Sequence, residues 1–383
     1  MPVHIQGTRV KQALSLAGVA AMILAVFSLA WGSQTADQGK TGQRLYREAC
    51  AACHGIDGTG APSSTVGFQT PLPDFSSCNF ATREPNADWY YVVAEGGPAR
   101  AFDPMMPAFG DALSEAEIIR VLDYIRAFCD NKDWPRGELN LPRPLVTTKA
   151  YPEDEVVLAS SINLDQDDRI ENELIYEQRF GARNQFEIIL PFGWSEQADS
   201  ETGDTEWTSS VGDIGLALKR VMFHSLETGS IVSLGAEVFL PTGDEDDGFG
   251  SDTTVFEPYV SYGQLLPADF FFQFQGGAAL PADTDKVNEE AFWRGALGRT
   301  FVFGQYGRAV SPMVELLGSK ELVSEADTNW DLVPQVQIPL NRRQHVRLGV
   351  GARIPLNDTD TRETSYGVYL LWDWFDGGFF AGW

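Results

Sequence analysis

The sequence predicts a two-domain protein: an all-α domain of about one hundred residues, then an all-β antiparallel transmembrane barrel of about twelve strands. Helical periodicity is confined to the first third of the 383-residue chain. A stretch with four prolines and no periodicity, residues 135–154, then marks the boundary. From residue 155 to 383, the chain consists of alternating segments of about ten residues, the length that a tilted membrane strand needs.

The N-terminal 32 residues are expected to be a signal peptide (1–32). Arg9 and Lys11 precede an apolar run over 14–31, and Ala30-Trp31-Gly32 offers small residues at the positions that a signal peptidase reads. The run is long for a signal peptide, so an uncleaved anchor is the alternative. Either form exports the rest of the chain. The formal net charge of −26 argues against a nucleic-acid partner, which would favour a basic face.

One pentapeptide in the first domain has the pattern of a cofactor-binding site. Cys50-Ala51-Ala52-Cys53-His54 has the spacing of a c-type haem attachment site, in which two thiols bond to one porphyrin edge and the histidine lies under the iron. A redox pair or half a zinc site would share this spacing, so the flanking sequence must decide. A short helix is expected at 42–46, and Met105-Met106-Pro107-Ala108-Phe109 follows downstream. Ser114 and Glu117 then form a capping box for an amphipathic helix.

In this order of elements, residues 37–134 resemble the class I cytochromes c. The resemblance implies an all-α fold, one haem c bound covalently to Cys50 and Cys53, and His54 and Met106 as axial iron ligands. Such ligation leaves no open coordination position, which suits an electron carrier rather than an enzyme. No catalytic residues are therefore expected.

Two further residues matter to this site. Met105 is the neighbour that could compete with Met106 as the iron ligand. The family also has a proline carbonyl that accepts a hydrogen bond from the proximal imidazole, and Pro62 is the candidate. The remaining cysteines, Cys78 and Cys129, form either a disulfide, which the exported location favours, or two buried free thiols.

The second domain, 155–383, contains twelve strand-like segments. They are 155–164, 171–180, 185–194, 213–223, 230–240, 254–264, 269–280, 291–303, 310–321, 331–340, 345–356 and 365–375. A soluble sandwich or lipocalin-like barrel would show the same alternation with its apolar face turned inward.

Loop length and charge favour a membrane barrel. Short turns alternate with longer acidic connections, as in outer-membrane barrels, which have short periplasmic turns and longer extracellular loops. The basic residues of the short turns are Arg183, Arg308, Arg342 and Arg343.

The last strand gives a third indication. The segment 365–372 resembles the C-terminal assembly signal of bacterial outer-membrane proteins, and the chain ends on the aromatic Trp383. Tryptophans near strand ends would form interfacial girdles. These are Trp194, Trp293, Trp330, Trp372 and Trp374.

Several polar residues of the barrel are interpreted as non-catalytic. The segment 244–252 lacks the spacing of an EF-hand, so a solvated loop is expected. His224 and His345 are interpreted as rim residues, and Glu237 and Glu315 as lumen polarity.

In layout the chain resembles the fused cytochrome–porin proteins of iron-oxidising bacteria, although their barrel is larger and their haem segment shorter. The resemblance implies an outer-membrane protein with its haem domain on the periplasmic side, passing electrons at or across that membrane. Expected partners are periplasmic redox proteins, outer-membrane lipid and an extracellular metal or other reductant, with iron doubtful as a substrate. A solute channel with a cytochrome gate or docking module, and a soluble periplasmic cytochrome with a β-rich partner-binding domain, are the alternatives.

Overall fold

The computed structural model describes residues 40–67, 71–163, 168–198, 205–245, 248–304 and 307–374. The predicted signal peptide and the terminal Trp383 lie outside these ranges. The described residues from Thr41 onward belong to one compact unit.

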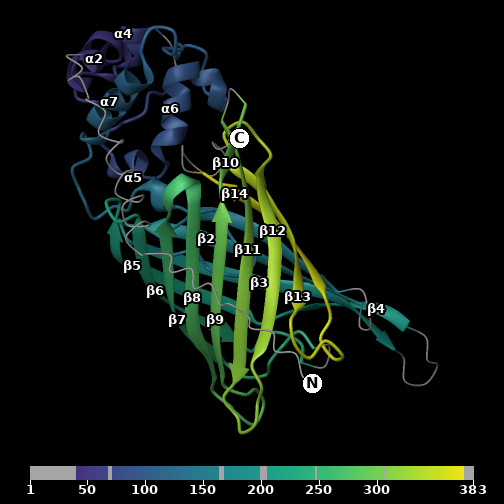
Figure 1. Cartoon of the computed structure of the whole chain (residues 1–383). Helices are drawn as coiled ribbons and strands as arrows, with labels where there is room; N and C mark the ends of the chain where they lie inside the picture. The colour runs from purple at the N-terminus through teal and green to yellow at the C-terminus, as the bar shows by residue number, and fades with distance from the viewer. Residues whose placement is uncertain are drawn as a thin grey trace, which may run out of the picture. The chain divides into compact units, whose positions relative to one another are not determined.

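The first domain is helical (Figure 1). Its elements are α2 (Gly42–Ala49), α3 (Ala51–His54), α4 (Ser63–Val66), α5 (Cys78–Ala81), α6 (Asn86–Glu95), η1 (Gly97–Arg100) and α7 (Glu115–Arg126). The capping box at α7 is confirmed, since Ser114 accepts from the Glu117 amide and the Glu117 carboxylate accepts from the Ser114 amide. No helix within the described ranges is both long enough and apolar enough to cross a membrane.

One apolar core holds these helices together. Leu45 and Tyr46 of α2 pack with the buried stripe of α7. That stripe consists of Ile118, Val121, Leu122 and Ile125. A disulfide joins Cys78, at the start of α5, to Cys129, just past α7, with 5.1 Å between their Cα atoms. Of the two alternatives for this pair, the structure contains the disulfide.

The second domain is a closed antiparallel barrel. In the described part of the chain, twelve strands follow one another around the ring, and β14 pairs with β1 to close it. They are β1 (Asp154–Asn163), β2 (Arg169–Phe180), β3 (Asn184–Ala198), β5 (Ile214–Ser225), β6 (Ser230–Leu240), β7 (Val255–Leu265), β8 (Phe270–Pro281), β9 (Glu290–Arg299), β11 (Arg308–Glu321), β12 (Asn329–Pro339), β13 (Val346–Pro355) and β14 (Ser365–Asp373). The predicted count and the predicted segments are both confirmed.

Two short strands extend this ring. β4 (Thr205–Val211) pairs with the outer half of β3, while β10 (Phe301–Phe303) pairs with the start of β11. β10 is the end of the predicted segment 291–303, whereas β4 lies between the predicted segments 185–194 and 213–223, where a connection was expected. Only Trp207 and Val211 of β4 are apolar, so its alternation is too weak to predict a strand.

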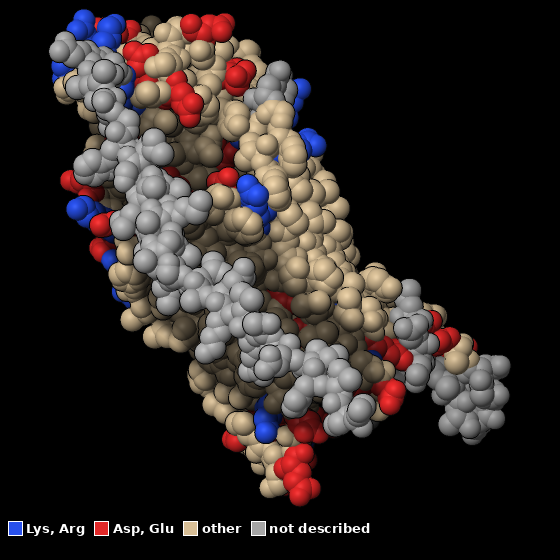
Figure 2. Space-filling model, in the orientation of Figure 1, with Lys and Arg blue, Asp and Glu red and all other residues tan. Residues whose placement is uncertain are grey.

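The barrel is apolar outside and polar inside. Leu370, Leu158, Leu174 and Leu190 are directly paired neighbours, and each is about 40% exposed on the outer wall. On the face that Figure 2 shows, the uncovered barrel surface between the two ends carries few charged side chains. Many of the buried strand residues are polar instead, among them Gln185, Gln273, Gln275, Glu315, Gln335 and Gln337, and they lie beside smaller apolar clusters such as that of Val157, Ile175 and Ile189. An apolar exterior over a polar lumen is the arrangement of a membrane-spanning barrel and the reverse of a soluble one.

Candidate haem site and barrel lumen

The attachment motif lies at the junction of two helices. Thr41 caps α2 by accepting from the Arg44 amide, and Cys50 lies between α2 and α3. Tyr46, fully buried, donates from its hydroxyl to the carbonyl of Gly55 at 2.7 Å. Helix α3 therefore places Cys50, Cys53 and His54 on one short turn. Among the described cysteines, Cys50 and Cys53 are the two free thiols.

The His54 imidazole is suited to ligate a metal. Burial lowers its pKa to about 4, so the ring is neutral at neutral pH, the form that coordinates iron. The Phe75 ring packs against it, with 5.0 Å between the ring centroids. Phe75 in turn belongs to the apolar core with Trp89.

The two adjacent methionines differ in burial. Met106 is partly buried and packs against the same core as Phe75. Met105 is 57% exposed, and its amide donates to the Asp103 carboxylate instead. The Met106 carbonyl accepts from the Gly97 amide at 3.0 Å, which fixes the loop against η1. Of the two, only Met106 has its side chain in the interior, as the predicted ligand must.

The Pro62 carbonyl was expected to accept a hydrogen bond from the His54 imidazole. That carbonyl accepts from the backbone amide of Thr65 at 2.8 Å at the start of α4. The His54 Nδ1 atom is buried and has no hydrogen-bond partner among the residues that the structure describes. The expected bond between them is thus absent.

The donor set fits a haem. A neutral buried imidazole, a core-facing thioether and two thiols at the spacing of one porphyrin edge lie beside an aromatic core. Cys50 and Cys53 would hold the group covalently, and His54 and Met106 would coordinate its iron. When bound, the haem supplies one-electron chemistry.

A second notable site is the barrel lumen, which is occupied by the chain itself. The segment 139–153, predicted as part of an extended linker, contacts inward-facing residues of strands around the whole ring. Side chains of seven strands form hydrogen bonds with the backbone of this segment. These strands are β14, β12, β11, β8, β6, β5 and β3. We call residues 139–153 the lumen segment.

The lumen segment enters from the short-turn end, turns midway and returns to β1. At its turn, the amides of Val146 and Thr147 donate to the Glu315 carboxylate, which lies halfway along β11. The Leu145 amide donates to Gln335 at 2.9 Å. A Cβ on Gly351 would lie 2.7 Å from a Leu145 methyl group, so glycine leaves the room that the segment needs. Glu315 therefore anchors the lumen segment and does not merely line a pore.

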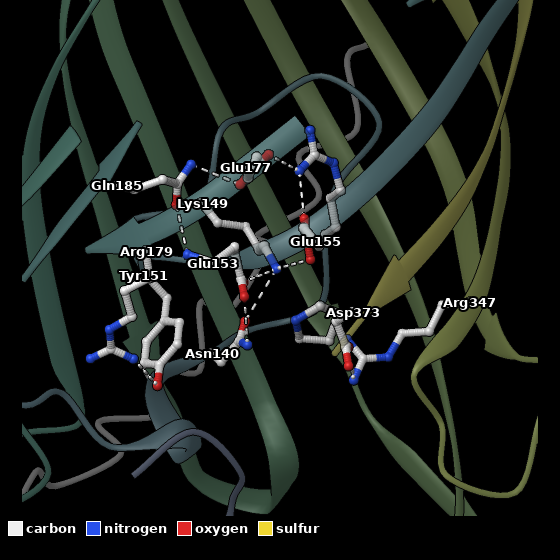
Figure 3. Close-up of polar contacts among 12 residues, drawn as sticks. Asn140, Lys149, Tyr151, Glu153, Glu155, Glu177, Arg179, Gln185, Arg347 and Asp373 are labelled. Atoms are coloured by element: carbon white, nitrogen blue, oxygen red, sulfur yellow. Dashed lines mark hydrogen bonds and ion pairs between the residues drawn. The ribbon is translucent and has the colours of Figure 1, made fainter. Parts of the chain in front are cut away.

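Ion pairs fix the two arms of the segment (Figure 3). Arg143 bridges Glu155 and Glu177, with N–O distances of 2.8 and 2.6 Å. Lys149 pairs with Glu153 and lies 3.5 Å from Glu155, and all three side chains are almost fully buried. Removing one partner of such a pair would leave a buried charge uncompensated, which typically costs about 3–5 kcal/mol.

Comparison with known proteins identifies the first domain. Residues 37–125 match the family model described as cytochrome c oxidase, cbb3-type, subunit III. The first domain is a cytochrome c domain. The chain is therefore a cytochrome fused to a β-barrel, as predicted.

The cytochrome–barrel chain has other similarities in its second part. Residues 161–307 match the family model described as putative MetA-pathway of phenol degradation. Solved structures similar to the barrel include an outer membrane channel, COG4313, from Pseudomonas putida F1, at 12% identity and a TM-score of 0.43, covering 61% of this chain and all of that one. Another is the KdgM porin, at 8% identity and a TM-score of 0.39, covering 57% and 99%. No curated protein is similar to the chain in sequence.

The cytochrome domain contacts the short turns of the barrel. Arg183, in the turn between β2 and β3, pairs with Asp133 at 2.8 Å, and Gln344, before β13, donates to Asp88 at 3.3 Å. Arg83 forms a largely buried ion pair with Asp154 at the start of β1. Among the described residues, the long connection 282–289 between β8 and β9 lies at the opposite strand ends.

His345 shows what the sequence could not. Predicted as a rim residue, it is 2% exposed and lies between Glu84 of the cytochrome domain, at 2.8 Å, and Asp373 of β14, at 3.2 Å. His224 does lie at the short-turn end of β5. The difference between the two histidines is tertiary, because the sequence places both at strand ends and only the contact with Glu84 buries His345.

Proposed function

We propose that the protein is an outer-membrane electron carrier, in which the barrel anchors a haem c domain at its periplasmic mouth. Cys50 and Cys53 would hold one haem covalently. With His54 and Met106 as the iron ligands, the haem would exchange electrons with partner proteins and would bind no substrate. Soluble periplasmic redox proteins are the partners that can reach this domain.

The observation that carries the proposal is the occupied lumen. A barrel filled to its midpoint by the lumen segment, with its buried ion pairs intact, is a support and not an open solute path. The short turns that contact the cytochrome domain are the periplasmic side in outer-membrane barrels. The apolar band of such a barrel is about 25 Å tall, so one haem at the mouth does not bridge it. Electron exchange at the periplasmic face is therefore the role that the arrangement favours.

A gated channel is the second candidate. The lumen segment is held by hydrogen bonds and ion pairs in a polar lumen, so its release would open a water-filled path. The cytochrome domain, continuous with this segment, would then act as the gate.

Reconstitution into liposomes separates the two functions. Vesicles would carry an encapsulated small solute, with reduced carrier protein added outside and haem absorbance followed in parallel. The electron-carrier proposal expects haem reduction and reoxidation by soluble partners while the solute stays inside. Solute release that follows the haem redox state would favour the gated channel. A protein recovered in the soluble periplasmic fraction would overturn both.

A further inference from the structure

The imidazole of His345 lies at the boundary between the barrel and the cytochrome domain. His345 immediately precedes β13, and its backbone belongs to the barrel. Its amide donates to the Asn341 side chain at 3.1 Å, and its carbonyl accepts from the Asp373 amide at 3.0 Å. The side chain is only 2% exposed, so the protein rather than water surrounds the ring. The barrel therefore fixes where this ring stands.

Both ring nitrogens face a carboxylate, one from each domain. Nε2 lies 2.8 Å from Glu84 of the cytochrome domain, and Nδ1 lies 3.2 Å from Asp373 of β14. A neutral imidazole has a single N–H group, so its other nitrogen would direct a lone pair at a carboxylate. The protonated ring has an N–H group on each nitrogen and is attracted to both carboxylates at once.

The charges on the barrel side of the ring favour this protonated form. Asp373 is fully buried, and neither of its carboxylate oxygens has a hydrogen-bond partner in the described part of the chain. Arg347 of β13 lies 3.3 Å from it (Figure 3). The neighbouring Glu155, paired with Asp373 across the strands, is already matched by Arg143 and Lys149. A protonated histidine thus supplies the second positive charge beside the buried Asp373 carboxylate.

The cytochrome side contributes two acids near the ring. Asp88 of α6 accepts from the side chain of Gln344, the residue before the histidine, at 3.3 Å. Asp88 also pairs with Arg100 at 2.8 Å, so its charge is matched inside the cytochrome domain. Glu84 is the acid of this domain that pairs with the ring itself. The attraction between Glu84 and the histidine therefore depends on the charge of the ring.

Two other ion pairs between the domains contain arginine instead. Arg83, next to Glu84 in the sequence, pairs with Asp154, and Arg183 pairs with Asp133. Arginine keeps its proton throughout the physiological range, whereas histidine is the side chain that ordinarily gains or loses one there. Of these three contacts, the one made by the histidine is expected to respond to pH.

We propose that His345 is a proton-dependent latch between the cytochrome domain and the barrel. With the ring protonated, Glu84 is held at the barrel mouth. With the ring neutral, one of the two carboxylates faces a lone pair, and the cytochrome domain is held less tightly. Because docking favours the protonated ring, the latch is complete below about pH 6 and is lost as the docked ring gives up its proton at higher pH. The latch is independent of whether the haem domain carries electrons or gates a channel.

Energy transfer to the haem measures how closely the cytochrome domain is held. A pH-insensitive dye would be attached to Thr228→Cys, in the exposed short turn between β5 and β6, in the full haem-loaded protein in detergent. Because the haem quenches a nearby dye, a longer fluorescence lifetime reports a cytochrome domain that has moved from the rim. Between about pH 5.5 and pH 8.5, a long-lived population should appear and grow by about tenfold, which corresponds to a tenfold difference in proton affinity between the docked and undocked rings.

Histidine variants assign this response to one residue. His345→Gln keeps a donor for Glu84 but has no charge to lose, so its lifetime should be the same at both pH values. His224→Gln is the matched control, because it removes the other histidine at the short-turn end of the barrel, and it should respond like wild type. The remaining histidines, His4 and His54, lie in the predicted signal peptide and at the predicted haem iron.

A second variant keeps the test decisive if His345→Gln does not fold. Glu84→Gln removes the charge on the cytochrome side of the latch and should abolish most of the pH response. A wild-type lifetime that does not change with pH would overturn the proposal. A full response in His345→Gln or Glu84→Gln, or a response lost in His224→Gln alone, would overturn it as well.

Discussion

The cytochrome domain and the barrel distribute polar and apolar side chains in opposite ways. The cytochrome domain has an apolar core in which Phe75, Trp89 and the helix α7 stripe surround the predicted iron ligands. The barrel interior holds many buried polar groups, and the same chain supplies charged partners to them, such as Arg143 and Lys149. In the first domain the interior selects a cofactor by excluding water. In the second, the interior selects a segment of its own chain by matching charges, so its integrity depends on every partner being present.

The largest expected effect concerns the iron ligands. Met106→Ala should lower the reduction potential by on the order of 100 mV, because the thioether ligand favours ferrous haem. Met105→Ala is the matched control, since its side chain is exposed, and should leave the potential near that of wild type. Spectroelectrochemical titration of both variants measures this. Equal shifts of the reduction potential in the two variants would contradict Met106 as the iron ligand.

Breaking the charge balance of the lumen comes next. Arg143→Ala leaves Glu155 and Glu177 buried without their shared cation, and should lower the free energy of unfolding by about 3–5 kcal/mol. Arg44→Ala removes the exposed ion pair with Glu48 on helix α2 and should cost at most about 1 kcal/mol. Urea denaturation of both variants in detergent gives the difference. Similar losses would show that the lumen pairs contribute no more than surface pairs.

The disulfide should matter to the cytochrome domain alone. Removing it by Cys78→Ala/Cys129→Ala should destabilise that domain by about 2–4 kcal/mol, since it closes a loop across a sequence separation of 51 residues. Haem absorbance during thermal unfolding follows the cytochrome domain, and resistance to unfolding by detergent follows the barrel. A shift confined to the barrel signal would contradict this assignment.

The smallest expected effect is at a helix cap. Ser114→Ala removes the capping box of α7 and should cost about 1 kcal/mol. Ser77 precedes α5 as its N-cap but makes no capping hydrogen bond through its side chain, so Ser77→Ala should change little. Thermal unfolding of the cytochrome domain compares the two. If Ser77→Ala lowered the stability of the domain more than Ser114→Ala, side-chain capping bonds would not explain the difference between the two positions.

Most of the fold could be predicted from local sequence patterns. The alternation of each barrel segment and the capping box before α7 depend on neighbours within a few residues, so the sequence alone shows them. The prediction of Met106 as an iron ligand is likewise based on a local motif. These predictions required no knowledge of tertiary contacts.

What the sequence could not show depends on partners far along the chain. The lumen segment lacks periodicity, and Glu315, its anchor, lies 168 residues from Thr147. His345 owes its burial to Glu84, 261 residues away. The alignment of Glu155 with Asp373 and Glu177 likewise exists only through strand register. A signal was nevertheless present, because Arg143 and Lys149 are cations in a proline-rich segment that precedes a barrel with acidic inward positions.

Thiol accessibility at the turn of the lumen segment tests the central claim most directly. The chain has four cysteines, two in the disulfide and two predicted to bind haem, so an introduced cysteine is the sole free thiol of the holoprotein. Thr147 is 2% exposed, whereas Thr228 is exposed in a short turn. With a membrane-impermeant maleimide, Thr228→Cys should label fully and Thr147→Cys should remain unlabelled in the folded protein. Equal labelling of the two would contradict a barrel closed by its own chain.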